Sequence, residues 1–411
     1  MTPARIVLVE PDGFGGLAHF AFQVANALAD EGADVTLLTS RHYELAHLPH
    51  RCRLDASLST WPNVRRGSPP GWMPPFLLNA GHRVRRVARG VRLVMVWAAL
   101  TRRLLRERPD VVQFSAIRFP VLGLFLRYLN HKGLVLTQVC HEFVPREKGA
   151  VGQALARRTG RWVYESFSMI FLAGNSVRDA FLATFPIDRA RTQTISLGAE
   201  SLFPAASATG ELRERYGMGT TEPVALFFGG LRPSKGIEDL VSAFAGVVRA
   251  VPNARLLIVG SPQAGVRPEA YVEQARAAGV HDSVKVDARY VPLDEVGAVM
   301  RTADVVVLPY RSGTASAVLQ VAYAFARPVI VTAVGSLAEA VVDGRTGLVV
   351  PAGDRDSLTA ALVRVLSDRT LAETMGREGR QWSAERHAWP AVARQILTST
   401  QAARARHSAT R

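Results

Sequence analysis

The stretch that most constrains the fold of this chain is Val224–Gly236, which reads VALFFGGLRPSKG. Its five apolar residues have the composition of a strand, two glycines then break the run, and a helical pattern begins at Ile237. Glycines allow the backbone to approach a ligand closely. Arg232 offers a planar fork of donors, and Lys235 a compact charge on a flexible stem. The stretch predicts a strand, a turn and a helix with a candidate anion site, and solvated loop cations are the alternative interpretation.

The N-terminal residues show the same succession of strand and helix. A strand-like run, Arg5–Glu10, leads through a glycine-containing loop to a helical pattern over Ala18–Leu28 and then to a second strand at Asp34–Thr39. Such a β-α-β unit is typical of doubly wound parallel sheets. The glycine spacing is only a weak dinucleotide signal, because Ser40 and Arg41 stand where an acidic residue is expected after the second strand.

Three later segments follow the opening stretch: LLIVG at 256–260, ADVVVLPY at 303–310 and RPVIVTAVGSLAEAVVDGRTGLVVPAGD at 327–354. Together with the turn at 229–236, they resemble the C-terminal, donor-binding half of the retaining nucleotide-sugar glycosyltransferases of the GT-B fold (family 4 or group 1 type). The resemblance covers roughly the whole second half of the chain. It implies an α/β fold of two Rossmann-like doubly wound domains that face a cleft.

The resemblance also implies how the chain divides. We expect an acceptor-binding Rossmann-like domain over 1–200, a donor-binding Rossmann-like domain over 201–384, and a terminal helix over 385–411 that crosses back to the first domain. The length of 411 residues agrees with two or three domains at about 150 residues each. Within the first domain, frequent Pro, Gly and Ser residues from Leu54 to Pro75 predict a long loop.

The functional residues of the family are carried over by position. In relatives the loop arginine and lysine neutralise the donor diphosphate, so the resemblance implies this role for Arg232 and Lys235. His141 follows a strand-like run, at the sheet edge where open α/β folds bind ligands. The resemblance implies that it orients the sugar or the acceptor, although a lone histidine is more often structural. The other residues implied in donor binding are Gly15, Gly16, Gly230, Tyr290, Val291, Ser316, Ala317 and Val318.

One part of the donor site departs from the family pattern. Most relatives carry two glutamates eight positions apart, and these positions fall at Gly313 and Val321. The local sequence resembles instead a subgroup in which a Ser-Gly-Val turn begins the helix, so that Ser316 and the next two residues would offer free backbone N–H groups to a diphosphate. Two interpretations stay open: an active enzyme with different ribose recognition, or a non-catalytic nucleotide-sugar-binding or scaffold protein.

The implied reaction is transfer of a hexosyl group from a nucleotide diphosphate sugar to an acceptor hydroxyl with retention of configuration, in exopolysaccharide, capsule or glycolipid assembly. No side-chain nucleophile is evident, and no Asp-x-Asp pair or His/Cys cluster indicates a metal. The nucleotide sugar is a co-substrate, and no other cofactor is expected. The expected acceptor is a glycan, either linked to polyprenyl diphosphate at a membrane or soluble and small.

Positive charge is concentrated in the first half of the chain. Residues 1–200 hold 26 Lys or Arg against 15 Asp or Glu (+11), and the remainder holds 24 against 20 (+4). Many of these arginines flank an apolar run in a predicted helix that ends at Arg108, and this pattern suits an anionic membrane surface bound through Arg83–Arg108. An ordinary packing helix with a solvated basic face is the alternative. No nucleic-acid motif accompanies the charge, so no nucleic-acid partner is expected.

Cysteine content and hydropathy bear on the expected compartment. Cys52 and Cys140 give neither a disulfide framework nor a metal spacing, which fits a reducing cytoplasm. The first residues lack the pattern of a signal peptide, and no apolar run approaches the roughly 20 residues of a membrane-spanning helix. We therefore expect a cytoplasmic protein, and the basic helix adds a peripheral position at the inner face of the plasma membrane as an alternative.

Overall fold

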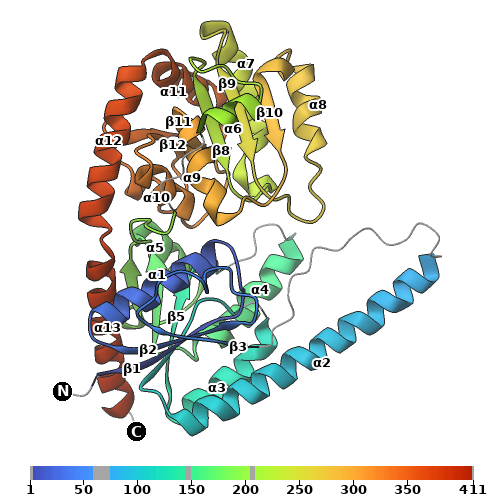
Figure 1. Cartoon of the computed structure of the whole chain (residues 1–411). Helices are drawn as coiled ribbons and strands as arrows, with labels where there is room; N and C mark the ends of the chain where they lie inside the picture. Colours follow the sequence, from blue (N-terminus) through green and yellow to red (C-terminus); the bar gives the residue numbers. More distant parts are fainter. Residues whose placement is uncertain (1–2, 59–74, 118, 144–149, 204–208, 410–411) are drawn as a thin grey trace.

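The computed structural model describes residues 3–58, 75–117, 119–143, 150–203 and 209–409, with residues 75–87, 150, 209 and 210 described by their backbone alone. These residues form two parallel sheets, one of seven strands and one of six. The sheets lie in two domains, one above the other in Figure 1. The predicted α/β fold of two Rossmann-like domains is confirmed.

The N-terminal sheet has the strand order β3-β2-β1-β4-β5-β6-β7, and every neighbouring pair is parallel. Sequence reasoning missed one of these strands, since β3 occupies the start of the predicted loop at Leu54–Pro75; residues 59–74 of that loop lie outside the described residues. The strands are β1 (Arg5–Glu10), β2 (Asp34–Ser40), β3 (Arg53–Leu58), β4 (Val111–Phe114), β5 (Val135–Cys140), β6 (Met169–Ala173) and β7 (Thr192–Ile195).

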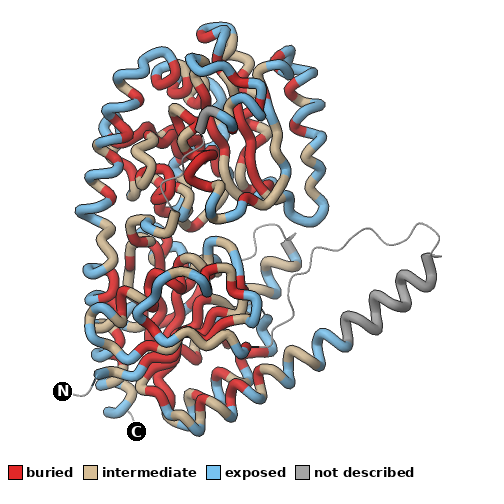
Figure 2. Tube along the Cα trace, in the orientation of Figure 1, coloured by how far each residue is buried: buried red, intermediate tan, exposed pale blue. Residues whose placement is uncertain are grey.

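Helices cover both faces of this sheet because successive strand residues point to opposite sides. Ile6 and Leu8 of β1 pack with α1, whereas Val7 and Val9 pack in a second cluster with α2 to α5. Both layers are buried inside the lower domain (Figure 2). The helices are α1 (Gly16–Asp30), α2 (Pro75–Glu107), α3 (Gly123–His131), α4 (Ala150–Tyr164) and α5 (Asn175–Thr184), with a 3-10 turn η1 at Pro120–Leu122.

The C-terminal sheet has the order β10-β9-β8-β11-β12-β13, again parallel throughout, around a single buried cluster. The opening sequence stretch supplies its strand β8 and the start of helix α7, as predicted. The strands are β8 (Val224–Phe228), β9 (Arg255–Val259), β10 (Val284–Asp287), β11 (Val305–Leu308), β12 (Val329–Thr332) and β13 (Gly347–Val350). The helices are α6 (Thr209–Arg215), α7 (Ile237–Ala250), α8 (Glu269–Ala277), α9 (Leu293–Thr302), α10 (Ala317–Ala324), α11 (Arg355–Ser367) and α12 (Arg369–Arg386).

The last helix, α13 (Trp389–Ala409), returns to the N-terminal domain, as expected from the sequence (Figure 1). Trp389 anchors the crossing: its indole Nε1 donates to Ala199 O at 2.7 Å and to Gln23 Oε1 at 3.0 Å. Further along, Arg394 forms an ion pair of 2.8 Å with Glu31 at the end of α1. Among the described residues, no helix combines the length and hydropathy needed to cross a bilayer.

Candidate active site between the two sheets

The carboxyl ends of strands from both sheets meet between the domains. Tyr290 follows β10, and its hydroxyl donates to Glu44 Oε2, which follows β2, at 2.6 Å. Thr314, beyond β11, donates through its hydroxyl to the backbone oxygen of His141 at the end of β5. Ligands of open α/β sheets bind at this edge. The structure therefore places the two predicted ligand-binding edges against each other.

The turn after β8 depends on glycine for its shape. Gly229 has φ +125°, and a Cβ at the neighbouring Gly260 would lie 1.7 Å from Gly229 O. Gly236 has φ +64°, and a Cβ there would lie 2.0 Å from Pro309 O. Gly230 has no positive φ, and a Cβ there would lie 3.9 Å from Ser261 O. The turn is thus held against two neighbouring chain segments by close backbone contacts.

The two cations of the turn lie beside the start of α10. Lys235 Nζ lies 3.4 Å from the centroid of the Tyr310 ring, a cation–π contact. The Tyr310 hydroxyl lies 2.9 Å from Ser316 Oγ, and burial raises the pKa of Tyr310 to about 12. Arg232 has no hydrogen bond or carboxylate partner among the residues that the structure describes, although its charge acts on Tyr310. Lysine, tyrosine and serine therefore form one connected group.

Helix α10 begins at this group. Ser316 is its N-cap, with extended backbone, and Ala317 is its first residue. The Val318 side chain lies close to the β8 turn, 3.7 Å from where a Cβ on Gly229 would be. Val321, one of the two positions where relatives carry glutamate, is buried in the core of the C-terminal domain. The structure thus brings Arg232, Lys235, Ser316 and Val318 together.

The opposite side of the cleft is the turn between β1 and α1. Gly15 has φ +82° and precedes α1, and a Cβ on Gly15 or Gly16 would meet nothing within 4 Å. Gly15 N–H donates to Glu44 Oε1 at 2.7 Å, and His19 Nε2 lies 2.6 Å from the same oxygen. Burial alone would raise the pKa of Glu44, but hydrogen bonds from His19, Tyr290 and Gly15 lower it. Glu44 is therefore an ionised carboxylate at neutral pH.

His141 lies next to α1 and is partly buried, with its Nε2 shielded from water. The ring packs edge-to-face against Phe20 of α1, with centroids 4.9 Å apart. Its Nε2 has no hydrogen-bond partner in the described part of the chain, and burial lowers the pKa of His141 to about 4. His141 is consequently a neutral imidazole at physiological pH, suited to orienting a polar group rather than to supplying a positive charge.

The structure also locates the remaining predicted residues. Tyr290, one of the residues implied in donor binding, sends its side chain across to Glu44, and Val291 is buried. Glu339 accepts backbone N–H groups from Asn175 (2.9 Å) and Ser176 (2.7 Å). Glu339 therefore caps the start of α5, a helix of the other domain.

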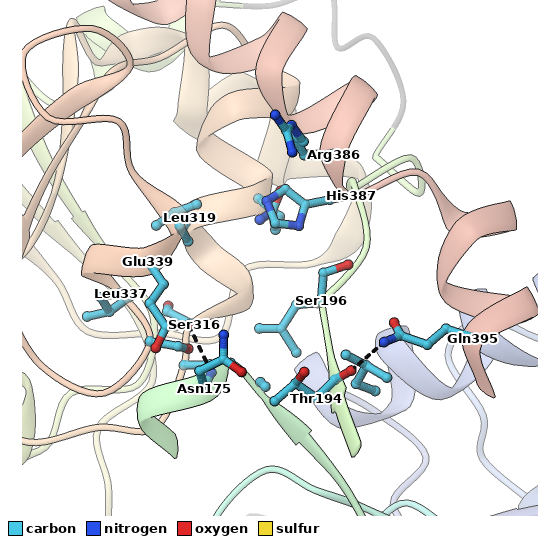
Figure 3. Close-up of a pocket in the computed structure, with 18 residues that line it drawn as sticks. Asn175, Thr194, Ser196, Ser316, Leu319, Leu337, Glu339, Arg386, His387 and Gln395 are labelled. Carbon is cyan, nitrogen blue, oxygen red and sulfur yellow. Dashed lines mark hydrogen bonds between the residues drawn. The ribbon is translucent and has the colours of Figure 1, made fainter. Parts of the chain in front are cut away.

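A cavity of about 290 Å³ lies nearby, between the domains at the helix crossing (Figure 3). Its walls include Asn175 and Ser196 from the N-terminal domain, Ser316 from α10, and His387 between α12 and α13. Burial lowers the pKa of His387 to about 4. Of the predicted site residues only Ser316 lines this cavity, so it adjoins the group around the β8 turn without containing its cations.

Sequence reasoning missed Glu44. The expected acidic residue was sought directly after the second strand, at Ser40 and Arg41, whereas Glu44 lies only a few residues further along and reaches back to Gly15 N–H. Its signal was therefore present in the sequence. A search over the whole loop after β2, rather than its first positions, would have found it.

Among the residues that the structure describes, no group of three or more His, Cys, Asp or Glu side chains could hold a metal ion.

Two parallel sheets of this topology, with a terminal helix that returns to the first domain, are the arrangement of the GT-B fold. The structure superposes on sucrose-phosphate synthase from Thermosynechococcus elongatus with a TM-score of 0.72 at 21% identity, covering 96% of this chain and 98% of the other. It also superposes on HepE of Anabaena in complex with UDP and glucose, with a TM-score of 0.71 at 16% identity, covering 97% and 100%. Identities this low support the fold alone.

Sequence comparisons identify the family. The family model of glycosyl transferases group 1 matches residues 209–382, and that of glycosyltransferase family 4 matches residues 14–200. A GDP-mannose-dependent alpha-(1-6)-phosphatidylinositol monomannoside mannosyltransferase from Mycolicibacterium smegmatis is 29% identical over 71% of this chain and 76% of its own length. A D-inositol 3-phosphate glycosyltransferase from Segniliparus rotundus is 34% identical over 46% and 42%. The chain spans less than half the length of this second relative. The chain belongs to the family 4, group 1 type glycosyltransferases.

Proposed function

We propose that the protein transfers a hexosyl group from a nucleotide diphosphate sugar to an acceptor hydroxyl, with retention of configuration and without a metal ion. The observation that carries this proposal is the group formed by Arg232, Lys235 and Ser316 at the carboxyl end of β8, on the sheet edge that faces the other domain. A departing diphosphate gains negative charge as the glycosidic bond breaks. Fixed cations and helix N–H groups at that place stabilise it.

The remaining predicted residues take supporting roles. Gly15 and Gly16 face the cleft with open space around them, which leaves room for donor phosphate or sugar. His141, held neutral, orients the sugar or the acceptor. We assign further donor contacts to the backbone groups of Gly230, Tyr290, Val291, Ala317 and Val318. Contacts of this kind do not depend on the identity of the side chain.

The missing glutamates define the alternative function. Because Val321 is buried and Gly313 has no side chain, neither position offers a carboxylate to a ribose. If no other group replaces them, the chain is a nucleotide-sugar-binding or scaffold protein without catalysis. The arrangement of Arg232, Lys235 and Ser316 favours the enzyme, since a scaffold has no need for Arg232 to stand at this edge without a carboxylate partner among the described residues.

Calorimetric titration with UDP, GDP, ADP and dTDP tests the proposal, followed by an assay of sugar transfer from the matching nucleotide sugar. We expect one nucleotide to bind the wild type and to bind Lys235→Ala at least tenfold more weakly, the scale of a lost charged hydrogen bond. A folded wild type that binds none of the four nucleotides would contradict the proposal. Binding without transfer or donor hydrolysis would favour the scaffold.

The proposed acceptor is a glycan linked to polyprenyl diphosphate or another lipid, presented at the inner face of the plasma membrane to a cytoplasmic enzyme. The name of the mycobacterial relative, a phosphatidylinositol monomannoside mannosyltransferase, supports a lipid-linked acceptor. The contact with an anionic membrane surface predicted through Arg83–Arg108 would be made mainly by the basic helix α2. Arg83, Arg85 and Arg86 lie where only the backbone is described, whereas Arg89, Arg102, Arg106 and Arg108 are exposed.

Two neighbouring helices extend this surface. Helix α3 contacts both α2 and α4, and together the three carry 12 arginines against one acidic residue, Glu107. Each helix exposes apolar side chains one turn apart, which places each pair on a single helix face. The pairs are Val91 and Met95 on α2, Leu124 and Tyr128 on α3, and Val151 and Leu155 on α4. Basic and apolar groups mixed in this way favour the interface of an anionic bilayer.

Vesicle sedimentation tests the three-helix surface of α2, α3 and α4. Leu124 and Leu155 are 59% and 62% exposed, so changing both to serine removes apolar surface with little effect on folding. We expect the double variant to bind phosphatidylglycerol-containing vesicles about tenfold or more weakly, from the area lost. Val272→Ser on α8, 37% exposed in the C-terminal domain, is the matched control and should bind like the wild type. Equal sedimentation of all three proteins would contradict membrane binding through the surface of α2, α3 and α4.

A further inference from the structure

Glu44 occupies the position at which the N-terminal glycine turn would meet the donor. Its Oε1 accepts Gly15 N–H at 2.7 Å and lies 2.6 Å from His19 Nε2. Its Oε2 accepts the hydroxyl of Tyr290, from the opposite domain, at 2.6 Å. The carboxylate is therefore held by three groups, and only 19% of the side chain is exposed.

A single N–H group cannot give a full hydrogen bond to two anions at once. A donor phosphate at Gly15 would also lie in contact with the Glu44 carboxylate, and like charges at such distances repel strongly in a partly buried site. The donor can reach this turn only if the Glu44 side chain turns away. That movement would also remove the acceptor of the Tyr290 hydroxyl and so break a bond between the domains.

We propose that Glu44 is an internal anion that competes with the nucleotide sugar for the glycine turn and that couples donor entry to release of Tyr290. The inference rests on the proposed function, because it assumes that the donor contacts Gly15. In the donor-free chain, Glu44 keeps the turn in shape and links it to Tyr290 of the other domain. When the donor arrives, its diphosphate replaces the carboxylate at Gly15 N–H, and the bond across the domains opens.

The sign of one affinity change tests this role. A residue that merely supports the turn would weaken donor binding when it is changed, whereas a competitor would strengthen it. In Glu44→Gln the neutral amide is a weaker acceptor than the carboxylate and no longer repels phosphate. We expect this variant to bind the nucleoside diphosphate that the wild type binds, UDP or GDP, on the order of tenfold more tightly. In steady state, KM for the donor should fall while kcat stays equal or decreases.

Two further variants make the test specific. Tyr290→Phe removes one of the three groups that hold the carboxylate, so it should tighten binding in the same direction by a smaller factor. Glu31→Gln is the matched control: it removes the same charge from the end of α1, where Glu31 pairs with Arg394, and should leave the affinity unchanged. Thermal melting of every variant shows that each is folded.

The outcomes separate this inference from the proposed function. Equal or weaker nucleotide binding by folded Glu44→Gln would overturn the competitor role while leaving the proposed function intact. An equal gain of affinity in Glu31→Gln would also overturn it, because the effect would then be one of net charge. If neither the wild type nor Glu44→Gln binds any nucleoside diphosphate, the proposed function fails and this inference with it.

Discussion

The two glycine turns on either side of the cleft differ in what they already contact. At the β1–α1 turn, Gly15 N–H donates to an internal carboxylate, Glu44. At the β8 turn, Arg232 has no carboxylate partner among the described residues, and Lys235 lies over an aromatic ring. With the proposed function, attraction for an anionic donor would come mainly from the C-terminal domain. The N-terminal turn, which is occupied by Glu44, would respond to the donor.

The largest effect should follow from removing the cations of the β8 turn. We expect Arg232→Ala and Lys235→Ala each to lower kcat/KM by about 10²–10³, the loss measured when one preorganised group that stabilises a developing anion is deleted. Lys285→Ala is the control, because Lys285 is exposed on β10 of the same domain. Steady-state kinetics with the nucleotide sugar measures the change. Near wild-type activity in both variants would show that the diphosphate is stabilised by groups outside this turn.

The next largest effect is on the free energy of unfolding, through the glycines of the β8 turn. Gly236→Ala should lower the free energy of unfolding by about 2–3 kcal/mol, because a Cβ adds left-handed strain and lies 2.0 Å from Pro309 O. Gly344→Ala is matched to it: Gly344 has φ +74° with nothing near its Cβ, so only the strain of about 1 kcal/mol remains. Denaturant unfolding measures both. Equal losses in the two variants would show that the contact with Pro309 does not constrain the turn.

A smaller, pH-dependent effect belongs to the N-terminal side. Burial lowers the pKa of His141 to about 4, so between pH 6.5 and 4 the unfolded chain binds a proton that the folded chain does not. The folded state should therefore lose about 2 kcal/mol of stability from this group as pH falls from 7 to 5. His141→Gln should reduce that loss, and His131→Gln, at an exposed position on α3, should not. Urea unfolding at the two pH values measures it, and identical losses in all three proteins would contradict the assignment.

Sequence patterns predicted the parts of this molecule that depend on local order. Apolar runs that end in glycine turns predicted β1 and β8, and the cations after β8 pointed to an anion site because they are adjacent in the chain. The strand β3 was missed, since its sequence RLDASL is only partly apolar and it lies at the edge of the sheet. Glu44 was missed for another reason, because the acidic residue was expected at the first positions after β2 and stands a few residues later. Its contact with Tyr290, from the other domain, could not be predicted, since only the tertiary fold brings the two residues together.

The smallest effect on stability is expected at Gly16, where a substitution tests contact with the donor separately from folding. Gly16 has no positive φ, and a Cβ there would meet nothing within 4 Å, so Gly16→Ala should change the free energy of unfolding by less than about 0.5 kcal/mol. If the donor comes close to this turn, the added methyl group should nevertheless raise KM for the nucleotide sugar about tenfold, because it occupies space that only the ligand needs. Kinetics and denaturant unfolding of the same preparation measure both quantities. Unchanged KM with unchanged stability would mean that the donor does not reach Gly16, and recognition would then rest on the β8 turn alone.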